Sequence, residues 1–492
     1  MKQTRAPIFE AVKKHSNNKI IPFHVPGHKG GGGLPELRDY IGEHLMAIDL
    51  TCMPDLDNIC SPKGVIHEAE KLAANLYGAD HAFFLTNGTT QGIQAMIMSV
   101  CAEGDKIILP RNAHKSALGG LILSGALPLY INPEINEEFG ISMGITPKKV
   151  RETLEHHPDT KGVFLIYPNY YGTASHISEI VEISHSFDVP VLVDEAHGAH
   201  LKFNKDLPIS SLEAGADLTA SSTHKLTGSL TQSSMLFLQK DRISPQKVKK
   251  VLNLTQTTSP SYILLSSLDL ARKQMAIYGE KLVERAIEIS HWIRSQLMVI
   301  EGCKIFGEGI VGNPGCHDYD PTKVTLNVQG LGFSGYEVES ILREKYRIQV
   351  ELSDLYNVIF LVSIGDTWEN AFHLVGSMKK IALQKTYNGT PRPFPPLPKI
   401  PKMIMSPREA FYSPTKVINL ENSVGEISAE PIMVYPPGIP LLCPGEIISQ
   451  EIIDYIGILK SENADLQGPI DQGINKISVL TNCNFLDKMQ IT

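Results

Sequence analysis

Short apolar runs alternate with helical patterns between about residues 64 and 238. The first helical pattern ends at Gly78 and is defined by apolar residues at helical spacing, namely Ile66, Ala69, Leu72, Ala73 and Leu76. The strand-like runs are Ala82–Leu85, Lys106–Leu109, Val163–Ile166, Val191–Val193 and Met235–Leu238. A helix is predicted over Ser178–Phe187. This alternation predicts a mostly parallel sheet that is covered by helices.

A second unit follows a long predicted helix between Ser266 and Ile300. Its predicted strands are Val324–Val328, Gln349–Leu352 and Val358–Val362. Its predicted helices are Glu337–Glu344 and Trp368–Ala382. We expect a smaller α/β domain here.

The chain of 492 residues is too long for one core, because single cores stop growing near about 250–300 residues. Prolines crowd the segment 391–402 and favour extended linker geometry. We therefore expect an N-terminal arm over 1–63, a large domain over 64–300, a small domain over 301–390, this linker, and a C-terminal domain over 403–492.

Composition excludes several classes of function. The formal net charge is −8, and the lysines and arginines are dispersed, so a role in nucleic-acid or membrane binding is not expected. The N-terminus lacks the apolar core of a secretory signal, which predicts a cytoplasmic protein. The 7 cysteines are scattered without a CxxC pair, so we expect reduced thiols and neither a disulfide framework nor a metal site.

Two charged residues mark the predicted ligand-binding edge of the sheet. Lys225 follows the run Ala216–Ser221, and open parallel sheets bind ligands at the carboxyl ends of their strands. Asp194 ends the Val191–Val193 strand. In enzymes that use pyridoxal 5′-phosphate (PLP), an aspartate at the pyridine nitrogen lets the ring accept electrons from the substrate. A solvated lysine and a helix-capping aspartate are the structural alternatives.

A phosphate site is predicted at the turn Gly88-Thr89-Thr90. This turn joins a strand to the predicted helix Gln91–Val100, so backbone N–H groups, hydroxyls and the helix dipole converge there. An ordinary helix cap is the alternative. Ser222 and His224 flank the lysine and would complete the phosphate site. His114 follows another strand and would lie over the pyridine ring, unless it is a structural histidine.

Motifs along almost the whole chain resemble the Orn/Lys/Arg decarboxylases of aspartate-aminotransferase fold, in particular the short arginine-specific members of Gram-positive type. The motifs are FHVPGHK (23–29), PKG (62–64), NGTT (87–90), PRNAHKS (110–116), VDEAHG (193–198), STHK (222–225), GSLTQSS (228–234), ELSDLY (351–356) and VYPPGIP (434–440). The large members carry an N-terminal wing domain before this region. Because the motifs begin by His24 here, we expect no wing and no assembly into decamers that depends on one.

The resemblance implies a fold, an assembly and roles for residues. The fold would be PLP-dependent transferase fold type I, and the assembly a homodimer or a multiple of it, with residues from both chains at each active site. The HVPGHKGGGG stretch would then be an ordered turn near the dimer's active site. Lys225 would carry PLP as a Schiff base, Asp194 would pair with the pyridine nitrogen, and His114 would stack on the ring. His197 would reach the phenolic oxygen of PLP, and the phosphate would be held by Gly88, Thr89, Thr90, Ser222 and His224.

The implied reaction is decarboxylation of a basic amino acid, with L-arginine giving agmatine and CO2 for polyamine and spermidine biosynthesis. Lysine and ornithine remain alternative substrates. Glu351 and Asp354 are candidate partners for the cationic side chain, unless they are solvated loop residues. The residues Asp194-Glu195-Ala196-His197 also resemble a motif of α-oxoamine synthases, which transfer acyl groups. A catalytically silent PLP-binding protein is the remaining alternative.

Overall fold

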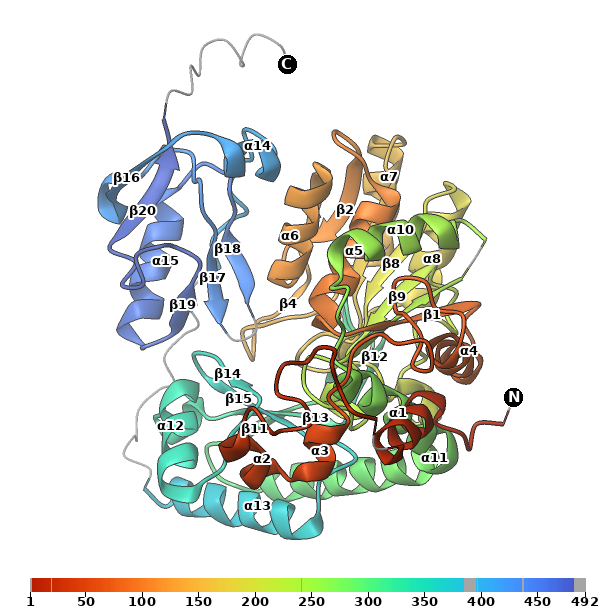
Figure 1. Ribbon diagram of the computed structural model, residues 1–492. Helices are drawn as coiled ribbons and strands as arrows, with labels where there is room; N and C mark the ends of the chain where they lie inside the picture. The colour runs from red at the N-terminus through yellow and green to blue at the C-terminus, as the bar shows by residue number, and fades with distance from the viewer. Residues whose placement is uncertain are drawn as a thin grey trace.

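The computed structural model describes residues 2–18, 20–239, 241–384, 395, 397–435 and 438–481. Its largest unit is built on a seven-stranded sheet with the strand order β1-β10-β9-β8-β6-β2-β3 (Figure 1). The strands are β1 (His81–Leu85), β2 (Lys106–Pro110), β3 (Leu127–Ile131), β6 (Gly162–Ile166), β8 (Val191–Asp194), β9 (Leu218–Ser221) and β10 (Ser234–Leu238). Neighbours from β3 to β9 pair in parallel, whereas β10 is antiparallel to both β9 and β1.

Helices cover both faces of this sheet. One face packs against α5 (Gly88–Val100), α6 (Lys115–Ser124) and α10 (Pro245–Thr255). The other packs against α7 (Pro147–His156), α8 (Ile177–Ser186) and α11 (Tyr262–Met298). In β8, Leu192 points to the first core and Val191 and Val193 point to the second. A strand that is buried on both faces needs a continuous apolar run, which explains why these strands are visible in the sequence.

The second unit is a four-stranded antiparallel sheet with the order β11-β13-β15-β14. Its strands are β11 (Lys304–Phe306), β13 (Lys323–Asn327), β15 (Asn357–Leu361) and β14 (Leu352–Ser353), and it packs against α12 (Gly335–Tyr346), α13 (Trp368–Ala382) and the end of α11. The predicted strand Gln349–Leu352 is wrong except for its last residue. Val350 is apolar because it packs into the core of this unit, not because it pairs in the sheet.

The C-terminal module combines two small sheets with α14 (Pro407–Tyr412) and α15 (Gln450–Ser461). The sheets pair β16 (Thr415–Asn419) with β20 (Lys476–Leu480), and β17 (Ile432–Tyr435) with β18 (Ile439–Leu442) and β19 (Asp465–Gln467). Arg111, just after β2, fastens the module to the large unit through Glu446, at 2.5 and 2.9 Å. Most of the proline-rich segment lies outside the described residues, as do Pro436, Pro437 and the end of the predicted C-terminal domain. The domain boundaries therefore remain predictions.

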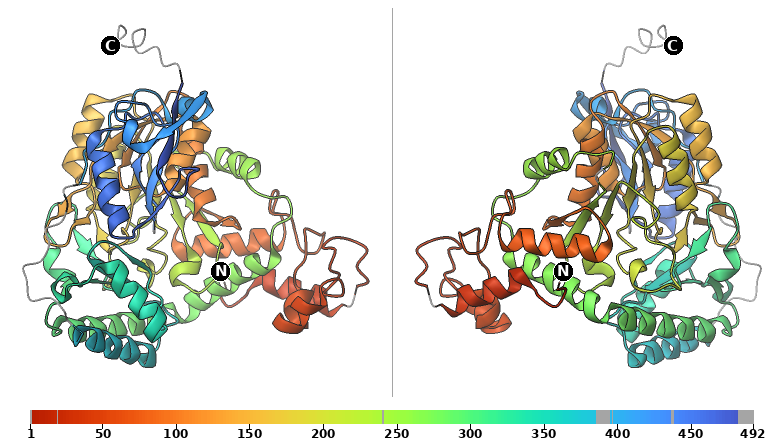
Figure 2. Two further views of the ribbon diagram at one scale, coloured as in Figure 1. Left: turned by 90° about the vertical axis from the view of Figure 1, so that its left-hand side faces the viewer. Right: turned by 90° about the vertical axis from the view of Figure 1, so that its right-hand side faces the viewer.

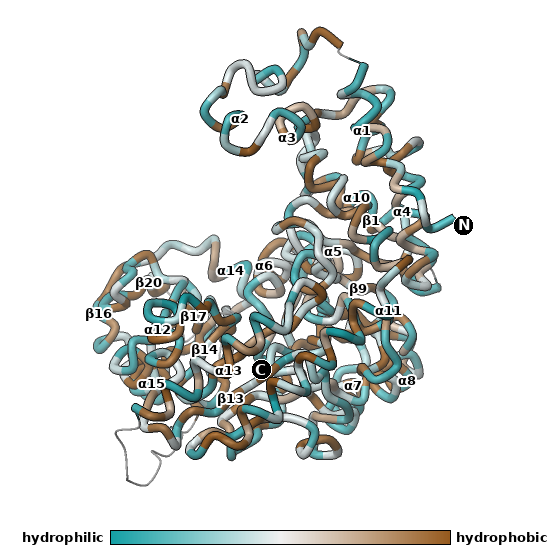
Figure 3. Tube along the Cα trace, turned by 90° about the horizontal axis from the view of Figure 1, so that it is seen from below, coloured by the Kyte–Doolittle hydropathy of each residue, from teal (hydrophilic) through white to brown (hydrophobic). Residues whose placement is uncertain are grey.

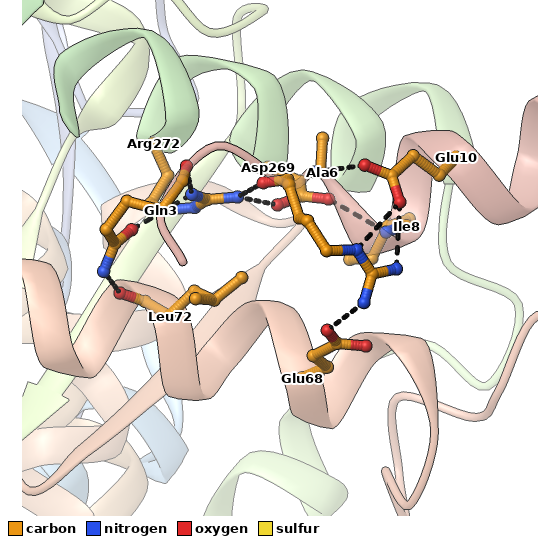
Figure 4. A network of polar contacts seen from close by, with 9 residues as sticks. Gln3, Ala6, Ile8, Glu10, Glu68, Leu72, Asp269 and Arg272 are labelled. Carbon is orange, nitrogen blue, oxygen red and sulfur yellow. Dashed lines mark hydrogen bonds and ion pairs between the residues drawn. The ribbon is translucent and has the colours of Figure 1, made fainter. Parts of the chain in front are cut away.

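The N-terminal residues are anchored on the large unit by a buried ion pair. Arg272 and Asp269 of α11 are 2.7 Å apart, and Arg272 also donates to the carbonyl oxygen of Gln3 at 2.8 Å (Figure 4). Asp269 accepts a hydrogen bond from the backbone N–H of Ile8, at the start of α1 (Pro7–Asn17). These contacts hold α1 against α11 and against α4 (Val65–Tyr77).

The chain beyond α1 projects from the body as an arm. The arm, defined here as residues 20–50, carries the short helices α2 (Pro35–Ile41) and α3 (Glu43–Ala47). It stands clear of the rest in both side views (Figure 2) and in the view from below (Figure 3). It exposes large apolar side chains, including Phe23, which is 96% exposed, and Tyr40, which is 90% exposed. Among the described helices, none is both long enough and apolar enough to cross a bilayer.

Candidate active site

Lys225 lies on the short helix α9 (Thr223–Leu226), which begins directly after β9. It lines a cavity of about 510 Å³ at the carboxyl ends of the parallel strands. Its Nζ atom lies 2.7 Å from Nε2 of His197. Burial lowers the pKa of the lysine, and the charges of Glu351 and Asp194 offset part of this effect. A larger neutral fraction makes the amine a better nucleophile.

Asp194 lies at the end of β8, on the strand next to β9. Its carboxyl group is buried in the wall of the same cavity, and burial raises its pKa to about 6. Among the described residues, its only hydrogen-bond donor is the backbone N–H of Ala196, at 3.1 Å. A carboxylate with so few donors needs a further hydrogen-bond partner to stay ionised.

The N-terminus of α5 forms another wall of the cavity. The helix begins at Gly88, which has a φ of +70°, and the Asn87 side chain does not cap it. The N–H of Gly88 donates to the carbonyl oxygen of Gln232 at 2.8 Å, and the next N–H groups of the first turn have no partner within the helix. The Thr89 hydroxyl is bonded to the hydroxyl of Ser222 and, at 2.8 Å, to that of Ser234, which ties this turn to the segment before Lys225. The site is suited to an anion.

Three histidines contact the cavity, and burial favours the neutral form of each. His114 caps α6 by accepting from the N–H of Ser116, and its pKa is lowered to about 4. His224 bonds through Nδ1 to the carbonyl oxygen of Ser233 at 2.8 Å, and its pKa is also lowered. Burial and the nearby Lys225 lower the pKa of His197. The Nδ1 atom of His197 is buried without a hydrogen-bond partner in the described part of the chain.

A buried network behind the cavity was not predicted from the sequence. Lys323 donates to the carbonyl oxygen of His197 at 2.9 Å and pairs with Asp320 at 2.5 Å. His200 lies 3.1 Å from the same carboxylate of Asp320. The network fixes the loop that follows Asp194. In the sequence this network is signalled only by Lys323, a charged residue at the first position of the otherwise uncharged strand β13.

The structure brings only one of the two candidate substrate acids to this cavity. Glu351 lines it together with Lys225. Asp354 instead lines a neighbouring cavity and accepts a hydrogen bond from the hydroxyl of Tyr171 at 3.0 Å. The two acids flank the two-residue strand β14 on either side, and their side chains enter different cavities.

All the other predicted site residues line the cavity of Lys225, and their chemistry fits PLP. They are Gly88, Thr89, Thr90, His114, Asp194, His197, Ser222 and His224. A buried acid with a single backbone donor matches the ring nitrogen of that cofactor, and an amine with a lowered pKa matches its aldehyde. The helix terminus matches the phosphate, and the orphaned Nδ1 of His197 matches the ring oxygen. Sequence analysis missed Tyr170 and Gln232, which also line the cavity. Within the described ranges, no group of three or more His, Cys, Asp or Glu side chains is arranged to hold a metal ion.

Comparisons with known proteins place almost the whole chain in one family. Residues 6–370 match the family "Orn/Lys/Arg decarboxylase, major domain", and residues 396–470 match its C-terminal domain. The chain is 46% identical to the arginine decarboxylase of Bacillus subtilis, with 98% of this chain and 99% of the relative covered. It is 45% identical to that of Bacillus anthracis, with 98% of each covered.

The fold prediction is confirmed by solved structures. The constitutive lysine decarboxylase of Escherichia coli superposes with a TM-score of 0.81 at 22% identity, covering 97% of this chain and 82% of that one. At this identity the likeness concerns the fold alone. The fold is that of PLP-dependent transferases of type I.

Proposed function

The chain belongs to the Orn/Lys/Arg decarboxylase family, and from this premise we propose that it converts L-arginine to agmatine and CO2, a step of polyamine and spermidine biosynthesis. The arginine decarboxylases that match over the full chain support this substrate over lysine and ornithine. The observation that carries the proposed chemistry is the meeting of Lys225, Asp194 and the N-terminus of α5 in one cavity. Acyl transfer is not favoured, because the family match spans most of the chain.

PLP is the cofactor of this family and fold. When bound, it takes up into its ring the electron pair left by the departing carboxyl group. Asp194 would hold the protonated ring nitrogen, and His114 would cover one face of the ring. Gly88, Thr89, Thr90, Ser222 and His224 would bind the phosphate. His197 would donate to the ring oxygen, which would give its orphaned Nδ1 or its Nε2 a partner.

Lys225 would have two tasks. In its neutral form its amine would bind the aldehyde carbon of the cofactor covalently, and substrate binding would set it free. Once free, its Nζ would share a proton with Nε2 of His197, 2.7 Å away. This pair would deliver the proton that replaces CO2 at the α-carbon.

Glu351 would orient the substrate. It lies in the cavity of Lys225, and its charge already acts on that lysine. A carboxylate can bind a guanidinium group through two parallel hydrogen bonds, which an ammonium group cannot reproduce. Glu351 would therefore favour arginine.

The active unit would be a homodimer in which each arm covers the partner subunit. The arm carries the motif residues 23–29 yet projects away from the body that holds Lys225 (Figure 2). Its exposed Ile21, Phe23 and Tyr40 would be unfavourable in water. A second copy that buried them would bring the motif to an active site. A cytoplasmic location is part of the proposal, on the strength of the scattered cysteines.

A product assay tests the function. The purified protein is loaded with PLP and given arginine, lysine or ornithine separately, without any acyl-CoA. We expect CO2 and agmatine from arginine, and a higher kcat/KM for arginine than for the other two. Absence of CO2 with all three would overturn the proposal in favour of acyl transfer or a silent PLP-binding protein.

A further inference from the structure

A second cavity, of about 740 Å³, lies where the three units of the chain meet. Three tyrosines from different units line it: Tyr171 from the loop after β6, Tyr336 from α12 and Tyr455 from α15. The hydroxyl groups of Tyr336 and Tyr455 have no hydrogen-bond partner within the described ranges. Burial raises the pKa of both phenols, and the nearby charge of Asp354 raises it further.

Asp354 gives this cavity a buried carboxyl group. Its oxygens accept hydrogen bonds from the Tyr171 hydroxyl, from the backbone N–H groups of Tyr356 and Asn357, and from the side-chain amide of Asn357. All these donors are neutral, and no lysine or arginine of the described chain pairs with this carboxylate. Burial raises the pKa of this carboxyl group, its hydrogen bonds offset part of that effect, and a bound cation would favour the ionised form. A second acid, the exposed Glu137, also lines the cavity.

The lining also includes the polar residues Asn112, Ser142 and Asn169, and one side of it is apolar. Leu355, Val434, Ile439 and Leu459 contribute hydrocarbon surface next to the tyrosine rings. Tyrosine faces attract cations, and hydrocarbon walls accommodate the methylene stem that carries a charged head. Phenol oxygens without partners can accept from N–H groups. The cavity thus offers each part of an alkyl cation a matching surface.

We propose that this cavity binds an alkyl amine or alkyl guanidine without a carboxyl group, at a site separate from the cavity of Lys225. A free α-carboxylate would be repelled by Asp354 and Glu137, so the site favours the decarboxylated product over the amino-acid substrate. The choice of agmatine as the probe rests on the proposed function, whereas the preference of the cavity for an alkyl cation rests on its lining residues alone.

Tyr170 connects the new site to the catalytic one. It lines both cavities, and its ring meets that of His197 edge to face at 5.1 Å. Tyr171, the next residue, holds Asp354. A ligand bound between the tyrosines would therefore contact the segment Tyr170–Tyr171, which in turn contacts His197. Through this segment the product could slow its own formation.

Calorimetric titration of the PLP-loaded protein with agmatine tests the proposal. The visible absorbance of PLP, followed in parallel, reports occupancy of the catalytic cavity. We expect a second class of agmatine sites that leaves the absorbance unchanged. In Tyr455→Leu and in Tyr336→Leu, on separate units, this class should weaken by about tenfold or more. Tyr412→Leu, an exposed residue of the same module as Tyr455, is the matched control and should bind normally.

Two further ligands and one further variant distinguish the possible results of the titration. 1,4-Diaminobutane in place of agmatine should bind if the ammonium group is sufficient, and arginine should bind more weakly than either. If the leucine variants do not fold, Tyr336→Phe, which keeps the ring and loses only the hydroxyl, should still weaken binding. A single class of sites that follows the PLP absorbance, or a second class untouched by every tyrosine variant, would overturn the proposal. Binding without CO2 release from arginine would overturn the proposed function and leave this site standing.

Discussion

The Nζ atom of Lys225 lies 2.7 Å from Nε2 of His197, and the two residues follow neighbouring parallel strands of one sheet. Both groups are basic and buried; burial lowers the pKa of each, and the charge of Lys225 lowers that of His197 further. Only one of them can readily hold a proton at a time. This relation turns two residues that are distant in the sequence into one proton-sharing pair beside the cofactor cavity.

Replacing Asp194 should separate catalysis from stability. In the protein without PLP, the pKa of Asp194 is raised to about 6, above its unfolded value, so the stability linked to its protonation is present at low pH and lost as the pH rises through about 6. Asp194→Asn should therefore stabilise the cofactor-free protein by roughly 1–3 kcal/mol at pH 8 and change little at pH 4. Urea unfolding at both pH values measures this difference. With PLP bound, the same variant should lose most of its kcat; full activity would refute its role at the ring nitrogen.

Asp320→Asn should destabilise the protein, because it leaves the buried charge of Lys323 without a counter-ion. We expect a loss of about 3–5 kcal/mol at neutral pH, measured by denaturant unfolding. The pKa of Asp320 is lowered by Lys323, so its contribution is present above the unfolded pKa and lost as the pH falls below it. Asp159→Asn, at an exposed ion pair, is the control and should have no measurable effect. Equal stability of the two variants would contradict this account of the network.

Glu351→Gln tests substrate recognition. The variant keeps the shape of the side chain and removes its charge, so KM for arginine should rise by about 10-fold or more while kcat changes less. Steady-state assays of CO2 release measure both constants. Glu369→Gln, an exposed acid on α13 of the same unit, should behave like the unchanged protein. An unaltered KM would exclude Glu351 as the partner of the guanidinium group.

Phe23→Asp tests the arm. If a second copy covers this side chain, a charge at the position should dissociate the dimer and abolish most activity, because the partner's motif would leave the active site. Sedimentation and the CO2 assay should then respond together. Ile470→Asp, an exposed apolar residue of the C-terminal module, is the control. A Phe23→Asp protein that is monomeric and fully active would contradict the proposal that the arm contributes to the partner's active site.

The sequence predicted the large unit well, because strands such as β8 and β9 are buried on both faces and read as continuous apolar runs. Their carboxyl ends then locate Asp194 and Lys225. The same apolar run does not reveal strand direction, so antiparallel β10 was not foreseen. The sequence could not show that Asp354 and Glu351 enter different cavities, because their directions depend on the tertiary packing around β14. The pairing of Lys323 with Asp320 depends on tertiary burial, which leaves no periodic trace.

The most direct test of the account is Lys225→Ala in the PLP-loaded protein. The variant should lose the visible absorbance of the lysine-bound cofactor, and kcat with arginine should fall on the order of 10³-fold or more. His197→Asn, measured alongside, should keep the absorbance and lose kcat. A Lys225→Ala protein that turned arginine over at the normal rate would contradict the central claim.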